Sequence, residues 1–180
     1  MKKLVVLLVF VAAGYQFYIN SNQFTFSDSP FTFESTSSKF HYEAKFPKKP
    51  KVSYQTLFVP ECGEVEFEVR YANSKGSSFI IFSGGYTKEF WEKDNESLES
   101  IAAMTLAGVM EIPDVQLIHE SEVYIDGVPA VEFVYLNPDG GYMKTIVLKY
   151  GVSGITIIGL YQQQNEHLAD EFIRTFKFIS

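Results

Sequence analysis

The chain has 180 residues, of which 22 are acidic and 15 are basic, so its formal net charge at pH 7 is −7. A body this acidic repels phosphate backbones, which argues against nucleic acid as a partner. With a single cysteine, Cys62, the chain cannot form an internal disulfide.

The first residues have the layout of an export signal. Two lysines precede an unbroken apolar run from Leu4 to Ala13. A basic start followed by a short apolar stretch and small residues is typical of a secretory leader. Counted onward, residues 4–19 approach the roughly 20 residues that a membrane-spanning helix needs. We therefore interpret residues 1–19 as a signal peptide or an N-terminal membrane anchor, and expect a secreted or periplasmic protein.

Residues 20–38 have the composition of a tether that carries one edge strand. Phenylalanine alternates with threonine at residues 24–26 and again at 31–33, as it does in strands, but an Asp-Ser-Pro sequence separates the two stretches. We place the folded domain at residues 39–180.

The domain begins with strand-like patterns. From Phe40 to Phe46, apolar side chains alternate with polar ones, which predicts a strand with one buried face. Further strands are expected at residues 52–59, 63–71 and 78–82. The last of these is apolar on both faces, as in a strand covered from both sides.

A helix and four more strands follow. Leu98, Ile101, Thr105 and Val109 recur at helical spacing. Strand-like runs are then expected at residues 115–124, 128–136, 142–150 and 154–161. Short connections such as Asp126-Gly127 join them, and these predict antiparallel neighbours because a parallel pair needs a crossover of about a dozen residues.

A last amphipathic helix starts after Asn165 and is expected to bury Leu168, Phe172 and Phe176. The predicted fold class is therefore α+β. We expect an antiparallel sheet of about seven strands with two main helices packed on it.

Three short motifs resemble the PsbP-like or Mog-like superfamily, whose members are antiparallel α-β-α sandwiches. They are Lys45-Phe46-Pro47 with Pro50, Ile125-Asp126-Gly127 with Pro129, Ala130 and Glu132, and Phe172-Ile173-Arg174-Thr175-Phe176. The resemblance spans residues 40–179 and implies an exported bacterial member of unknown function. It implies a non-enzymatic scaffold that binds or assembles something, and it brings no catalytic residues.

Although the chain is acidic overall, one short segment is basic, with lysines at Lys45, Lys48, Lys49 and Lys51. Two prolines, Pro47 and Pro50, restrain this segment, and its lysines form a candidate contact for an acidic partner or an anionic membrane surface. The alternative is a solvated loop.

Three other sets of residues are candidate functional sites, and each lacks residues that such a site would need. Glu64, Glu66 and Glu68 are expected on the outward face of their strand, as a solubilising row or as part of a calcium site. His167 and Glu171 share a helix face, but two ligands do not close a metal site. Cys62 would need a base brought to it by the fold to act as a nucleophile. We predict no catalytic residue, cofactor or metal.

The function predicted from the sequence is a non-enzymatic, extracytoplasmic binding or assembly module. Its partner would be a protein of the cell envelope, with membrane contact only through an uncleaved N-terminal segment. A carrier of a small apolar ligand is the alternative, because the chain holds 17 Phe and 11 Tyr residues. A small hydrolase that uses Cys62 is the third hypothesis.

Overall fold

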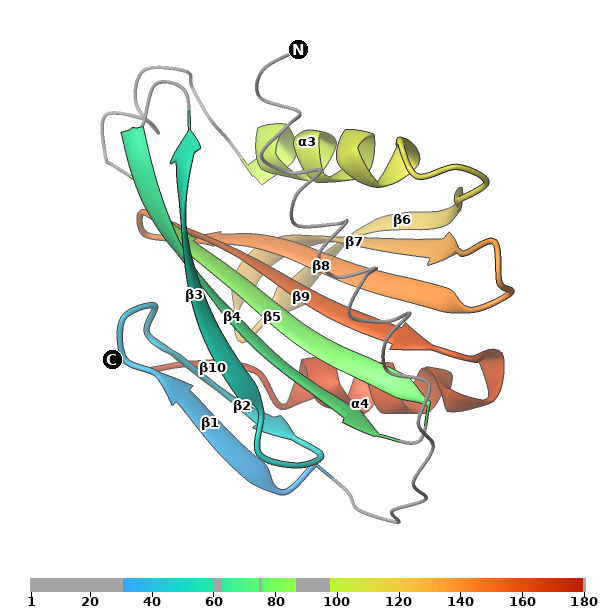
Figure 1. The fold of residues 1–180 in the computed structure, drawn as a ribbon, viewed down its shortest axis with the longest axis horizontal. Helices are drawn as coiled ribbons and strands as arrows, with labels where there is room; N and C mark the ends of the chain where they lie inside the picture. Colours follow the sequence, from blue (N-terminus) through green and yellow to red (C-terminus); the bar gives the residue numbers. More distant parts are fainter. Residues whose placement is uncertain (1–30, 60–62, 75, 87–97, 180) are drawn as a thin grey trace.

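The structure is a computed structural model that describes residues 31–59, 63–74, 76–86 and 98–179 (Figure 1). Its elements in chain order are β1 (Phe33–Ser37), β2 (Tyr42–Phe46), β3 (Lys51–Val59), β4 (Gly63–Ser74), β5 (Ser77–Gly85), α3 (Leu98–Met110), β6 (Gln116–Ile125), β7 (Val128–Leu136), β8 (Tyr142–Tyr150), β9 (Ser153–Tyr161), the short 3₁₀ helix η1 (Gln163–Asn165), α4 (Glu166–Arg174) and β10 (Lys177–Phe178). The predicted leader, the first part of the predicted tether and Cys62 lie outside the described residues.

Seven strands form the main sheet, in the order β3-β4-β5-β9-β8-β7-β6, and every neighbouring pair is antiparallel. The predicted α+β class and the seven-stranded antiparallel sheet are confirmed. The turn between β6 and β7 is Asp126-Gly127, with φ angles of 49° and 81°. Two consecutive positive φ angles are what a tight hairpin turn requires, and this dipeptide adopts them readily.

A second, three-stranded sheet has the order β1-β2-β10. The predicted strand at residues 40–46 therefore belongs to this small sheet and not to the large one. Its buried face, which includes Phe40, Tyr42 and Phe46, packs into one of the two hydrophobic cores. β1 pairs with β2 from Phe33↔Phe46 to Ser37↔Tyr42.

The last helix ends at Arg174, two residues before Phe176, so the predicted helix is too long. Thr175 terminates it, since its hydroxyl donates to the Phe172 carbonyl at 2.7 Å and accepts from the Lys45 amide at 2.9 Å. The chain then leaves the helix axis, and Lys177 and Phe178 pair with β2. Phe176 is still buried, as predicted, but from the short segment between α4 and β10.

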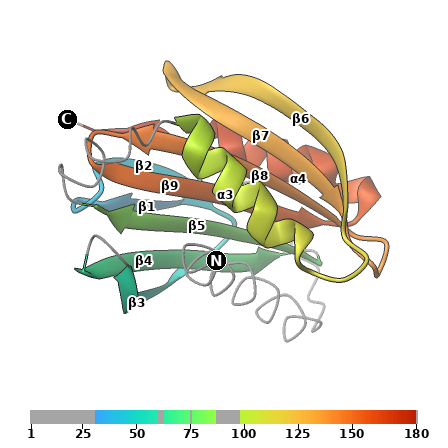
Figure 2. The same cartoon turned by 90° about the horizontal axis from the view of Figure 1, so that it is seen from above.

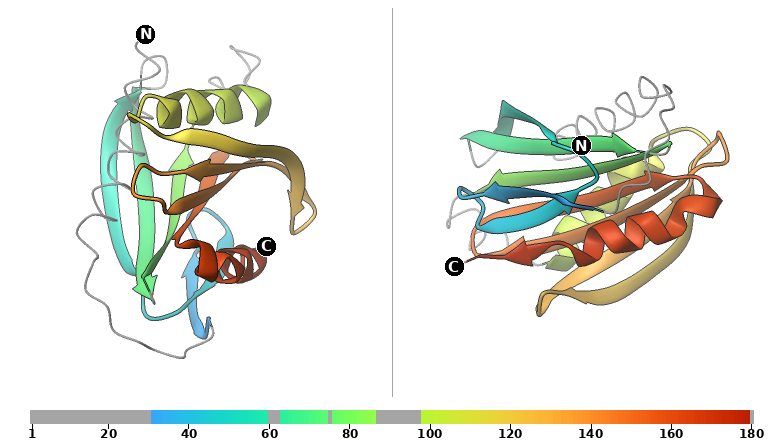
Figure 3. Two further views of the ribbon diagram at one scale, coloured as in Figure 1. Left: turned by 90° about the vertical axis from the view of Figure 1, so that its right-hand side faces the viewer. Right: turned by 90° about the horizontal axis from the view of Figure 1, so that it is seen from below.

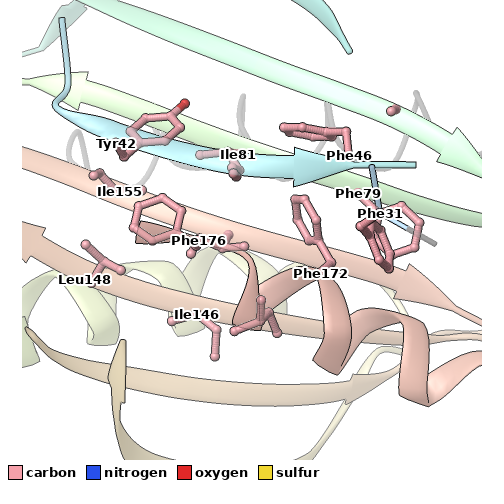
Figure 4. Close-up of a cluster of buried hydrophobic side chains, with 14 of the residues drawn as sticks. Phe31, Tyr42, Phe46, Phe79, Ile81, Ile146, Leu148, Ile155, Phe172 and Phe176 are labelled. Atoms are coloured by element: carbon pink, nitrogen blue, oxygen red, sulfur yellow. The ribbon is translucent and has the colours of Figure 1, made fainter. Parts of the chain in front are cut away.

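The two faces of the main sheet carry separate cores. One face packs with the small sheet and α4, and the other packs with α3 (Figures 2 and 3). Phe172 of α4 lies at the centre of the first core, with ring centroids 5.1 Å from Phe46, 5.1 Å from Phe79 and 5.8 Å from Phe31 (Figure 4). Such aromatic clusters contribute both buried area and preferred ring geometry.

α4 approaches β9 closely at one point. A Cβ atom built on Gly159 would lie 2.8 Å from the Cβ of Ala169. Only glycine on the strand and a small residue on the helix allow this distance. Gly159 and Ala169 therefore fix the position of α4 over the sheet.

The prediction that Glu68 lies on a solvated face of its strand is wrong, because its side chain is buried. Its side of β4 lies beneath the small sheet. Arg70 donates to it from Nε at 2.6 Å and from Nη2 at 3.1 Å, and Tyr42 donates to it at 3.2 Å. Arg70 also donates to Ser35 of β1 at 2.7 Å. Alternation shows which side a residue takes, but not whether that side is covered.

Both members of this buried ion pair lie on β4, and their hydrogen bonds with Tyr42 of β2 and Ser35 of β1 connect the main sheet to the small sheet. Burial alone would raise the pKa of Glu68, but the hydrogen bonds and charge of Arg70 outweigh it and hold that pKa below its usual value. Since the pKa is lower in the folded than in the unfolded chain, the ionised carboxylate stabilises the fold above the unfolded pKa. That contribution disappears as the pH falls through the folded pKa.

We expect Glu68→Gln to lower the free energy of unfolding by about 3–5 kcal/mol at pH 7, because it leaves the Arg70 charge buried without its partner. Urea unfolding at a series of pH values measures the effect. The difference from the wild type should shrink as the pH falls from the ordinary pKa of a glutamate towards the lowered pKa of Glu68, where the wild-type carboxylate also becomes protonated.

Glu66→Gln is the matched control. Glu66 lies on the same strand and pairs with Lys39 at 2.6 Å, but both side chains are about half exposed. Its loss should therefore cost less than about 1 kcal/mol. Equal losses for the two variants would contradict the role given to Glu68.

Candidate functional site

A polar groove lies over the edge of the main sheet beside η1 and the start of α4. Its volume is about 290 Å³. The residues that line it are Ile118, His119, Glu132, Val134, Tyr142, Lys144, Tyr161, Gln163 and Glu166. They come from four adjacent strands, β6 to β9, and from the two helical segments that follow.

The strand register explains why these side chains converge. Val134 of β7 is paired with His119 on one side and with Lys144 on the other, so the three side chains point to the same face. Tyr142 is paired with Tyr161, and their rings stack with centroids 5.8 Å apart and planes 15° apart. This is the face that also carries α4.

Lys144 is the centre of the groove. Only 7% of its surface is exposed, and its ammonium lies 2.6 Å from Asp170 of α4 and 3.9 Å from Glu132 of β7. A buried ammonium is stable only with such partners. Glu166 adds a third carboxylate to the same surroundings, so the groove has a net negative charge.

Tyr161 is held protonated in the groove. Burial raises the pKa of its phenol, and the negative charges of Glu166, Asp170 and Glu132 raise it further. The phenol is therefore a neutral hydrogen-bonding group, and Lys144 is engaged in ion pairs. The geometry suits recognition by charge and stacking.

The predicted lysine cluster lies elsewhere. Lys45 is 3.4 Å from Glu34, and Lys51 lies over the Tyr71 ring with its ammonium 5.7 Å from the centroid. Lys48 and Lys49 are exposed in the connection between β2 and β3. None of the four lines the groove, and their role as a partner or membrane contact stays a hypothesis.

The remaining sequence candidates do not form a site in the structure. His167 and Glu171 are exposed on α4. Among the described residues, no three His, Cys, Asp or Glu side chains come close enough to hold a metal ion. The glutamate row of β4 is divided, since Glu64 is exposed, Glu66 pairs with Lys39 and Glu68 is buried.

Sequence reasoning missed the groove residues, although one signal was present. Lys144 stands on the same face of its strand as Ile146 and Leu148, both of which are buried. A lysine in a row of core residues is rarely left without a carboxylate partner. The partners Glu132 and Asp170 are 12 and 26 residues away in the chain, and no local pattern links them to Lys144.

Comparison with solved structures shows that the fold is PsbP-like. The chain is similar to cyanobacterial PsbP (CyanoP) from Synechocystis sp. PCC 6803, with a TM-score of 0.54, 13% identity, and coverage of 87% of this chain and 98% of that one. A Pseudomonas aeruginosa protein of unknown function is also similar, with a TM-score of 0.42, 11% identity, and coverage of 80% and 96%. No protein-family model and no curated protein matches the sequence.

Neither helix in the described part of the chain has the length and apolar character needed to cross a bilayer.

We expect Lys144→Met to lower the free energy of unfolding by about 1–3 kcal/mol. The change keeps the side-chain length but leaves Glu132 and Asp170 without their shared cation. The loss should be smaller than for a fully buried pair because the Asp170 side chain is 38% exposed. Adding Asp170→Asn should restore part of the stability, since it removes one uncompensated charge.

Lys48→Met is the control, because Lys48 is exposed. It should change the stability by no more than about 0.5 kcal/mol. A Lys144→Met variant that is as stable as this control would show that the ion pairs of the groove contribute nothing to the fold.

Proposed function

We propose that this protein is a non-enzymatic binding module of the cell envelope, and that its polar groove receives a positively charged side chain of a partner protein. The observation that carries the proposal is the excess of carboxylates in the groove. Glu132 and Asp170 pair with a single ammonium, that of Lys144, and Glu166 lines the same groove.

The internal pairs leave part of this charge available to a partner. Asp170 takes the close contact with Lys144, whereas Glu132 is 3.9 Å from the ammonium and Glu166 is exposed. A guanidinium that enters between Glu132 and Glu166 gains charge-assisted hydrogen bonds. It also meets the stacked rings of Tyr142 and Tyr161, on which arginine packs favourably.

The net charge of −7 supports the same class of partner, because a negative body attracts a basic one over distances of about a Debye length. Arginine is favoured over lysine, because its planar fork matches carboxylates and stacks on aromatic rings. The proposed partner surface is therefore an arginine-containing loop or chain end.

The non-enzymatic character is part of the proposal. Within the groove, Lys144 is held by carboxylates and the raised pKa of Tyr161 keeps its proton in place, so neither is prepared to act as a base. The hydrolase alternative depends on Cys62, which lies outside the described residues.

The proposal also covers the cellular location of the protein and the arrangement of its helices on the sheet. The basic and apolar start of the chain supports export, with residues 1–19 either cleaved or retained as an anchor. We also propose that α3 and α4 cover the sheet as the outer layers of a PsbP-like sandwich. The similarity to CyanoP supports this fold, and at 13% identity it brings no partner with it.

The test is a nuclear magnetic resonance titration with an acetylated, amidated Gly-Arg-Gly-Arg-Gly peptide, with the lysine analogue beside it. We expect the amides of Tyr142, Lys144 and Tyr161 to shift, and the arginine peptide to bind more tightly. The double variant Glu132→Gln/Glu166→Gln should weaken binding about tenfold or more, because both carboxylates contact the incoming cation.

The control removes the same charge elsewhere. Glu122 and Glu171 are exposed and do not line the groove, so Glu122→Gln/Glu171→Gln should change the affinity less than about threefold. Equal weakening by the two double variants would mean that only the overall charge attracts the peptide. That result would overturn the groove as the binding site.

A further inference from the structure

A basic and partly apolar surface lies at one end of the molecule, where the connection between β2 and β3 lies beside the start of β1 (Figure 1). We call this surface the lysine end. None of its residues lines the polar groove. Its exposed residues are Lys45, Lys48, Lys49 and Lys51, together with the apolar residues Phe33, Val52 and Tyr54.

Two prolines hold the lysine side chains outward. Pro47 and Pro50 are buried, whereas Lys48 and Lys49 between them are exposed. A proline fixes its own φ angle and restricts the residue before it, so the connection has few backbone conformations to choose from. The two ammonium groups therefore project into solvent from a restrained segment, which loses little backbone entropy when they bind a partner.

The lysine end is positively charged although the whole chain is negatively charged. Lys45 is 3.4 Å from Glu34, and the Lys51 ammonium lies over the ring of Tyr71, which is neutral. Glu34 therefore compensates one of the four lysines. Because the lysines lie within seven consecutive residues, an anionic surface meets them together.

The apolar residues of the lysine end come from the open edges of both sheets, since β1 and β3 are edge strands. Val52 of β3 is the register partner of Arg70, which donates to Ser35 of β1. Ser35 and Phe33 point to the same face of β1, as do the two members of a register pair. This contact brings Phe33, 40% exposed, and Val52, 42% exposed, to the same side of the molecule.

This combination of residues suits a lipid surface better than an acidic protein. Arginine is the cation whose geometry matches a carboxylate, and the exposed cations of residues 45–51 are all lysines. Lysine has a point charge on a long apolar stem, which suits a layer of headgroups without fixed geometry. Exposed apolar side chains beside such charges can enter the boundary between headgroups and acyl chains.

The order of the chain favours the same partner. The described domain begins at Phe31, two residues before Phe33, so the preceding sequence joins the domain at the lysine end. That preceding sequence contains the apolar run from Leu4 to Ala13. A membrane segment in this run would hold the lysine end, and not the opposite end of β1, next to the bilayer.

We propose that the lysine end docks on an anionic lipid surface, with its ammonium groups on phosphate headgroups and with Phe33 and Val52 at the boundary to the acyl chains. The proposal rests on the proposed location in the cell envelope, and it does not depend on the polar groove. It adds a membrane contact of the folded domain to that of the N-terminal segment.

The test measures co-sedimentation of the full chain with lipid vesicles. One set of vesicles is phosphatidylcholine alone, and the other is phosphatidylcholine and phosphatidylglycerol in equal parts. Binding to the neutral vesicles measures what the apolar N-terminal segment contributes. We expect the anionic vesicles to bind the chain about tenfold or more tightly, and we expect this preference to disappear at high salt.

Lys48→Gln/Lys49→Gln is the informative variant. It should lower the affinity for anionic vesicles about tenfold and leave the affinity for neutral vesicles unchanged, since each lysine contributes separately at a charged surface. Lys39→Gln/Lys149→Gln is the matched control. It removes the same charge outside the lysine end, from the turn between β1 and β2 and from the end of β8, and should weaken binding less than about threefold.

A second pair of variants tests the apolar contact. Val52→Thr should weaken binding to anionic vesicles about threefold, because it makes an exposed apolar side chain polar at the lysine end. Val152→Thr is the control, since Val152 is 46% exposed but lies in the turn between β8 and β9. It should leave the affinity unchanged.

Three results would overturn the proposal. The full chain could bind both kinds of vesicle equally, or the two double lysine variants could bind anionic vesicles equally well. An oligoglutamate peptide could shift the amide resonances of Lys48 and Lys49 while anionic vesicles gain no preference, which would assign the lysine end to an acidic protein. The arginine-peptide titration of the groove would stand or fall separately.

Discussion

The close contact between Gly159 of β9 and Ala169 of α4 is the constraint on which much of the molecule depends. It allows the helix to lie directly on the strand, where a larger side chain on either partner would force the two apart. At that distance Phe172 reaches the centre of the aromatic core, and Asp170 reaches the ammonium of Lys144. The contact between Gly159 and Ala169 therefore positions α4 both for the aromatic core and for the polar groove.

The two faces of the main sheet differ in how they treat charge. The face beneath α4 and the small sheet contains the ion pairs of Glu68 with Arg70 and of Lys144 with Asp170 and Glu132. The opposite face, beneath α3, has a hollow whose lining, as far as the described residues go, includes no lysine, arginine, histidine or carboxylate. Buried charge needs a partner of opposite sign, whereas buried hydroxyl and amide groups need only a hydrogen bond.

Local patterns predicted much of the fold. The period-two alternation and the Asp126-Gly127 turn are properties of neighbouring residues, and they gave an antiparallel sheet of seven strands. The end of the last helix was harder, because Phe176 continues its apolar spacing. What stops the helix at Arg174 is the bond between Thr175 and Lys45, whose partners are 130 residues apart.

The candidate site could not be predicted in the same way. The burial of Glu68 follows from the small sheet that covers β4, and the groove follows from contacts between β7, β8 and α4. Lys144 alone carried a signal, as a cation among core residues, but its partners are distant in the chain. Sequence periodicity assigns a residue to one side of an element, and only the tertiary arrangement determines what lies on that side.

The most direct test of this account is the free energy of unfolding of Gly159→Ala. Away from a close contact, replacing glycine with alanine in a strand usually stabilises a protein by about 0.4–1 kcal/mol through the unfolded chain. If α4 rests on Gly159, the added methyl group should instead destabilise the protein by about 1–3 kcal/mol, because the helix must move outward. A variant as stable as the wild type, or more stable, would contradict the central claim that this contact fixes α4.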